Sequence, residues 1–203
     1  MPEILRSLLV VLLVGTAVFH FARPHCIAMG MQPRNYDVQK KLWFGITLAA
    51  FLAHDYFLFA AIAVGLIYVY RKQHTNLPAL YAGLLLTVPL FGKDIPGLGI
   101  INYFFTLDYS RLLSLCILLP AYLHLRKLKE TPKFGSTWVD KLVLAYLVYG
   151  LAKQVPLDTF TNSLRTMFHL GLDVVLPYYV ASRGARTIQD IREILVALLL
   201  AVL

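Results

Sequence analysis

The residues best suited to chemistry lie four positions apart in one apolar stretch of the chain. Between Asn162 and Arg192 the sequence places Arg165, His169 and Asp173 among leucine, valine and aromatic residues. Because residues four apart share one face of a helix, the spacing predicts a helix that carries these three groups in a row. An arginine can grip a phosphate with its planar fork of donors, and a histidine with an aspartate can pair or relay a proton.

Two further cations, Arg111 and Lys93, precede this stretch, and we expect them to join Arg165 in binding a diphosphate. An alternative interpretation assigns no ligand to these groups. In it, Arg165 and Arg111 extend toward lipid head groups. His169 and Asp173 then only satisfy each other between helices. The sequence leaves both interpretations open.

Motifs for nucleotide and metal chemistry are absent from the sequence. Neither Gly-x-Gly-x-x-Gly, nor Gly-x-x-x-x-Gly-Lys-Ser/Thr, nor His-Glu-x-x-His occurs. The two cysteines, Cys26 and Cys116, are too few for a cysteine-based metal site. We therefore expect no metal and no cofactor. The net charge of +8 lies in short basic clusters between apolar runs, a pattern typical of membrane orientation and not of nucleic-acid binding.

Composition predicts the kind of structure that positions these residues. Of the 203 residues, 59% are hydrophobic and 15% are charged, and the mean hydropathy is +0.67. A soluble domain carries about 25% charged residues. We therefore predict an all-α fold, a polytopic transmembrane helix bundle of about eight helices without a soluble domain. This single domain would span residues 1–203.

Apolar runs and polar breaks define the expected helices. His54-Asp55 is interpreted as a turn between two helices, and Thr187 with Asp190 resembles a capping box. Ile100–Phe105 is too short to cross a bilayer and is expected to be interfacial or re-entrant. The expected apolar helical runs are Ile4–Phe21, the two halves of Leu42–Tyr70, Leu77–Phe91, Leu112–Leu125, Leu142–Leu151, the stretch that begins at Asn162, and Ile194–Leu203.

The distribution of lysine and arginine predicts an orientation. Most of these 19 residues lie in loops 21–41, 71–77, 126–141 and 182–192, which the positive-inside rule assigns to the cytoplasm. The N-terminus and the loops 92–110 and 152–165 are then expected on the opposite side, with Arg165 at the outward-facing surface. Because Ile194–Leu203 is too short to cross a bilayer, we expect the chain to be the N-terminal part of a longer protein.

Three stretches of the chain resemble a known family. They are Lys41–Tyr70, Val88–Arg111 and, above all, Phe160–Arg192. The last reads Asn-x-Leu-Arg, then Asp-x-x-Leu-Pro-Tyr-Tyr-x-x-Ser-Arg, and then Gln-Asp-Ile-Arg at the start of a helix. In these patterns the chain resembles the N-terminal half of the O-antigen ligase family, whose relatives include the O-antigen polymerases.

The resemblance implies a multi-pass protein of the bacterial inner membrane with its active face in the periplasm. Such an enzyme transfers an undecaprenyl-diphosphate-linked O-antigen glycan to lipid A-core, in lipopolysaccharide maturation. The reaction needs neither nucleotide nor metal, because the diphosphate is already a good leaving group. The catalytic histidine of the family is expected in a loop beyond residue 203, so His169 does not take that role. The implied partners are the lipid-linked donor, lipid A-core and membrane lipid.

Other functions remain open at this level. An O-antigen polymerase would use the same donor and differ only in its acceptor. A transporter or flippase subunit would use His169 and Asp173 as an intramembrane relay. A structural scaffold would require none of the polar residues.

Overall fold

The computed structural model describes residues 3–88, 92–97, 103–154 and 159–203, with only the backbone of Gln154. Internal contacts divide the chain into two compact units, each described below by itself. Unit 1 comprises Met1–Phe91 and Ala185–Leu203, and unit 2 comprises Gly92–Gly184. The expectation of a single domain over residues 1–203 stays a prediction.

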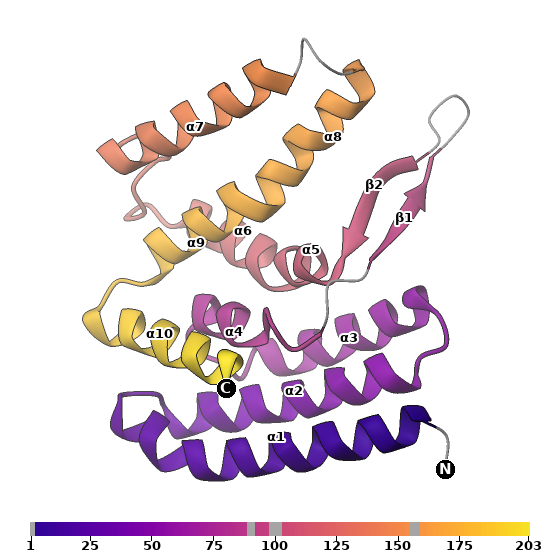
Figure 1. The fold of residues 1–203 in the computed structure, drawn as a ribbon. Helices are drawn as coiled ribbons and strands as arrows, with labels where there is room; N and C mark the ends of the chain where they lie inside the picture. Colours follow the sequence, from indigo (N-terminus) through magenta and orange to yellow (C-terminus); the bar gives the residue numbers. More distant parts are fainter. Residues whose placement is uncertain (1–2, 89–91, 98–102, 155–158) are drawn as a thin grey trace. The chain divides into compact units, whose positions relative to one another are not determined.

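Within its described residues, unit 1 consists of helices that lie against one another (Figure 1). They are α1 (Glu3–Ala28), α2 (Pro33–Leu52), α3 (Tyr56–Arg71), α4 (Leu77–Leu84) and α10 (Ile188–Val202). Buried side chains of α1, α2, α4 and α10 form one apolar cluster. Phe19 of α1 packs edge-on against Trp43 of α2, with ring centroids 5.5 Å apart. Ala79 of α4 and Ala197 of α10 are fully buried, so the small side chains bring these two helices close together.

Local capping signals determine where two of these helices begin. Asp55 precedes α3 and accepts a hydrogen bond from the backbone N–H of Phe57 at 2.8 Å, which confirms the predicted turn at His54-Asp55. Thr187 and Asp190 form the predicted capping box at the start of α10. The Thr187 hydroxyl accepts from the Asp190 N–H at 3.1 Å, and the Asp190 carboxylate accepts from the Thr187 N–H at 2.9 Å.

Unit 2 contains a strand pair and two long helical runs. Strands β1 (Gly92–Pro96) and β2 (Tyr103–Asp108) pair antiparallel, with Lys93 opposite Leu107. The first run joins α5 (Tyr109–Leu113), a π-helical segment (Ser114–Leu118) and α6 (Leu119–Lys127) without interruption. After α7 (Trp138–Gln154), the second run joins α8 (Phe160–Leu170), a π-helical segment (Gly171–Val175) and α9 (Leu176–Gly184).

The prediction of a polytopic transmembrane bundle is wrong. Helices make up most of the residues that the structure describes, but among these residues only α1 is long and apolar enough to cross a membrane. A signal sequence near the N-terminus can also be this long and apolar, so α1 is weak evidence for a membrane location, and a multi-pass location is not supported. The β1–β2 pair also departs from the all-α prediction.

Two predicted segments differ in detail from the structure. The helix expected over Leu77–Phe91 ends at Leu84, and residues 89–91 lie outside the described part of the chain. A proline at position 89 disfavours helical backbone in the residue before it, which is consistent with an early end. The segment Ile100–Phe105 was expected to be interfacial or re-entrant. Its residues 100–102 are not described, and Tyr103–Phe105 belong to β2.

Candidate functional site

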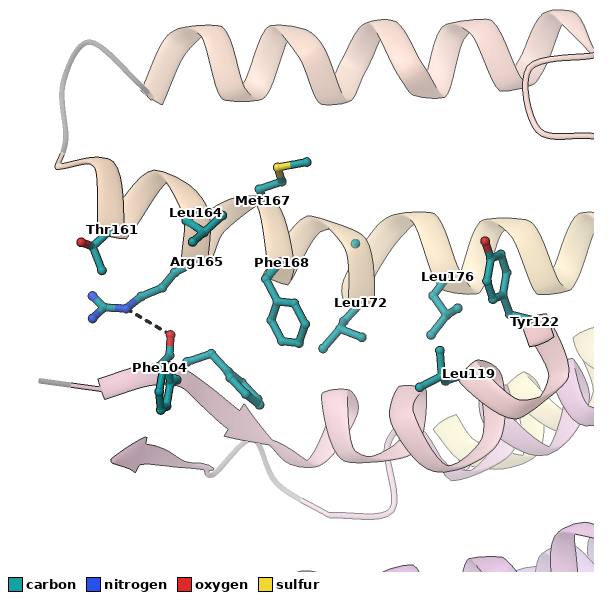
Figure 2. Close-up of a pocket in the computed structure, with 12 residues that line it drawn as sticks. Phe104, Leu119, Tyr122, Thr161, Leu164, Arg165, Met167, Phe168, Leu172 and Leu176 are labelled. Atoms are coloured by element: carbon teal, nitrogen blue, oxygen red, sulfur yellow. Dashed lines mark hydrogen bonds between the residues drawn. The ribbon is translucent and has the colours of Figure 1, made fainter. Parts of the chain in front are cut away.

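Unit 2 contains an apolar cavity of about 710 Å³ between β2, α6 and the α8–α9 run (Figure 2). Figure 2 shows Phe168, Leu172 and Leu176 pointing from the helical run toward the β2 and α6 side. The lining residues are Phe104, Phe105, Leu119, Tyr122, Thr161, Leu164, Arg165, Met167, Phe168, Gly171, Leu172 and Leu176. Almost all of these side chains are aliphatic or aromatic, so the cavity suits an apolar chain and offers few polar contacts.

Arg165 is the cation of the cavity wall, and it lies beside Thr161 at one end (Figure 2). Its Nε donates to the backbone carbonyls of Tyr103 and Phe104, at 3.1 and 3.2 Å, and Nη1 donates to the side-chain oxygen of Asn162. The guanidinium also stacks over the Tyr103 ring, 3.7 Å from its centroid. All these partners are uncharged, so among the described residues no carboxylate offsets the charge of Arg165.

Arg111, by contrast, is held between two carboxylates. Its Nη2 lies 2.9 Å from the Asp173 carboxylate, and its Nη1 lies 3.3 Å from Asp108 and donates to the Thr106 carbonyl at 2.7 Å. Asp108 also caps α5 by accepting from the Arg111 backbone N–H at 2.9 Å. Arg111 therefore joins β2 and α5 to the second helical run, and its charge is already offset.

His169 and Asp173 are not each other's partners. Asp173 lies in the π-helical segment Gly171–Val175 and accepts hydrogen bonds from Arg111. The Nε2 atom of His169 is buried without a hydrogen-bond partner. Burial, and then the nearby Arg111 charge, lower the pKa of His169, so its imidazole is neutral at pH 7. The structure therefore shows no hydrogen bond between His169 and Asp173 through which a proton could pass.

Lys93 belongs to β1 and does not line the cavity. It is exposed and lies opposite Leu107, near the Asp108 end of the hairpin, whereas Arg165 contacts Tyr103 at the other end. Of the three cations predicted to bind a diphosphate, only Arg165 lines the cavity. Arg111 lies in the ion-pair cluster, and Lys93 lies on the exposed strand.

Sequence reasoning missed the residues that hold Arg165 in place. Asn162 is three positions earlier on the same helix, and this spacing alone could have indicated a contact. The carbonyls of Tyr103 and Phe104 had no such signal, because they come from a strand that was not predicted. No group of three or more potential metal ligands occurs among the residues that the structure describes.

Comparisons with known proteins give no relatives for this chain: no family model, no curated protein and no solved structure matches.

Proposed function

We propose that unit 2 binds an amphiphile with a long apolar chain and an anionic head, and that this ligand is a polyprenyl-diphosphate-linked glycan. The apolar cavity with an uncompensated arginine at one end is the observation that carries the proposal. The walls would hold the first isoprene units of the lipid, and Arg165 would meet the diphosphate. An arginine with neutral partners keeps its full attraction for an anion.

The proposed reaction is transfer of the glycan to an acceptor hydroxyl. The acceptor oxygen forms a bond to the anomeric carbon of the glycan, and the bond from that carbon to the diphosphate oxygen breaks. A base takes the hydroxyl proton, and the lipid diphosphate leaves with the electron pair. Arg165 would stabilise the charge that develops on the leaving diphosphate.

The acceptor distinguishes two versions of this function. Transfer to lipid A-core would make the protein an O-antigen ligase, and transfer to another glycan chain would make it a polymerase. Both versions use the same lipid-linked donor at the periplasmic face of the inner membrane, and the resemblance in Phe160–Arg192 does not distinguish them. Incubating the protein with lipid-linked glycan and with each acceptor separately would distinguish the two by the product that forms.

Binding is the direct test on the chain itself. The full chain in detergent is titrated with undecaprenyl diphosphate and, in parallel, with undecaprenol, which has the same apolar chain and no charge. Arg165→Ala should weaken diphosphate binding about 10- to 100-fold, from the loss of a charged hydrogen-bond donor worth roughly 1.5–3 kcal/mol. Undecaprenol binding should not change. Arg165→Lys should recover part of the loss, because it keeps the charge and loses the fork.

A cavity-filling variant tests the apolar part of the site. Gly171 lines the cavity, and a Cβ atom added there meets nothing within 4 Å. Gly171→Leu should therefore occupy ligand space and weaken the binding of both lipids. Gly65→Leu is the matched control, because Gly65 is a helical glycine of unit 1 with equally open surroundings.

Equal diphosphate affinity of Arg165→Ala and the wild type would refute the proposal.

A further inference from the structure

The connection from α6 to α7 combines exposed cations with exposed apolar side chains. We name Arg126–Lys141 the basic segment. Its cations are all exposed: Arg126, Lys127, Lys129, Lys133 and Lys141. Between them Trp138 is 72% exposed, and Leu128 and Phe134 are exposed as well. Such a mixture of cations and large apolar side chains matches the composition of surfaces that lie in a membrane interface.

The basic segment holds five cations and two acidic residues, Glu130 and Asp140. Glu130 is exposed and offsets one positive charge. Asp140 is fully buried, and its carboxylate lies 2.7 Å from Nη2 of Arg183 in unit 2. The hydrogen bond with Arg183 is the largest of the causes that hold the pKa of Asp140 well below its usual range. This carboxylate therefore stays ionised and paired with Arg183. The exposed face of the segment therefore keeps a net positive charge, since its five cations outnumber the single exposed carboxylate.

The same ion pair fixes the shape of the basic segment. Asp140 accepts hydrogen bonds from the backbone N–H groups of Gly135 and Thr137, both at 3.1 Å, and from the Tyr178 hydroxyl at 2.7 Å. Arg183 also faces the Phe134 ring, 5.9 Å from its centroid. These contacts tie the loop to α9. The cations and Trp138 are thus presented on an ordered loop, which lowers the entropy lost on docking.

We propose that the basic segment docks on an anionic phospholipid surface, with its cations at the head groups and Trp138 at the interface. Each lysine or arginine beside an anionic leaflet adds roughly fivefold to the binding constant, and tryptophan prefers the interfacial depth. Beyond Trp138 the exposed apolar surface continues along α7 through Val139, Leu142 and Leu144. A nucleic-acid backbone would leave this surface in water, whereas a lipid surface covers it. None of the residues that line the cavity belongs to the basic segment, so this proposal is independent of the proposed ligand site.

Trp138 fluorescence provides the test. The chain has two tryptophans, so Trp43→Phe leaves Trp138 as the sole reporter. The full-length variant is reconstituted in nanodiscs of phosphatidylcholine alone, or with phosphatidylglycerol added. The expected result is a blue shift of Trp138 emission, and quenching by brominated lipid, that grows with the anionic lipid and falls with salt. Lys127→Glu, Lys129→Glu and Lys133→Glu together should abolish the dependence on anionic lipid.

The matched control reverses three exposed cations of unit 1, Arg34→Glu, Lys41→Glu and Lys72→Glu, with the same change in net charge. It should leave the Trp138 response intact. Equal quenching in both lipids, or an equal loss in the control, would overturn the proposal, as would displacement of the segment from anionic nanodiscs by RNA. Wild-type chain gives a second measurement that needs no variant. Anionic nanodiscs should protect Lys127, Lys129 and Lys133 from an amine-reactive label, and unchanged labelling would also overturn the proposal.

Discussion

The buried pair of Asp140 and Arg183 allows a quantitative prediction about unit 2. Asp140→Leu leaves the Arg183 charge buried without its carboxylate, since the Arg183 side chain is only 4% exposed. Removing one partner of a buried ion pair costs about 3–5 kcal/mol. Arg183→Met should cost about 3 kcal/mol, because Tyr178, Gly135 and Thr137 still donate to the remaining carboxylate.

The double variant, Asp140→Leu with Arg183→Met, should be more stable than either single variant. Replacing both charges by apolar side chains removes the desolvation cost of each. What remains lost are the hydrogen bonds of the Tyr178 hydroxyl and of two backbone N–H groups, at about 1 kcal/mol each. The removed desolvation cost offsets part of this loss, so we expect a net cost of about 2 kcal/mol. A double variant that is more stable than either single variant identifies an ion pair that is costly to break on one side but adds little stability as a whole.

Hydrogen exchange of the α9 amides around the buried Val180 measures this cost locally, without assuming that both units unfold together. A cost of about 3 kcal/mol corresponds to exchange faster by about two orders of magnitude in each single variant. The double variant should show a smaller increase. If the effects of the single variants simply add in the double variant, the two residues do not act as a coupled pair, and the reasoning is refuted.

Two further predictions concern unit 1. Burial lowers the pKa of His74 to about 4 from an ordinary 6.5, so the unfolded chain takes up this proton at a higher pH than the folded chain. Stability should therefore fall as the pH drops below about 6.5, by about 2 kcal/mol at pH 5, and His74→Asn should abolish this part of the pH dependence of α4 amide exchange. Thr187→Ala removes the capping hydroxyl of α10 and should cost about 1 kcal/mol, measured as faster amide exchange in the first turn of that helix. Thr187→Ser, which keeps the hydroxyl, is its control.

The sequence was informative where the signal is local. The turn at His54-Asp55 and the capping box of Thr187 and Asp190 each depend on residues within a few positions of one another. Composition, however, was a poor guide to architecture. An apolar run predicts burial, in lipid or in protein, but it does not determine where a helix ends, and α4 stops at Leu84 within such a run.

Contacts between distant residues were the part that the sequence did not reveal. From the sequence, β1 was assigned to the loop 92–110, and the first described residues of β2 to the interfacial or re-entrant segment Ile100–Phe105. Pairing between them depends on cross-strand contacts such as the Thr106 hydroxyl donating to Asp94 at 2.6 Å. Asp173 was assigned to His169 because the two are four residues apart, whereas its partner Arg111 lies 62 positions earlier in the chain.

The pairing of Asp173 with Arg111 determines which of the two arginines, Arg111 or Arg165, has a charge available to an anion. The sequence ranked Arg165 and Arg111 alike, but Arg111 uses its charge on Asp173 and Asp108, and Arg165 binds only neutral oxygens. Arg111→Gln should therefore loosen unit 2 and lower the affinity for undecaprenyl diphosphate and undecaprenol by the same factor. Arg165→Ala should reduce the preference for the diphosphate itself. The ratio of the two affinities separates these roles, because a general loss of structure cancels in it. If Arg111→Gln lowers the ratio as much as Arg165→Ala does, compensation by carboxylates is not what distinguishes the two arginines.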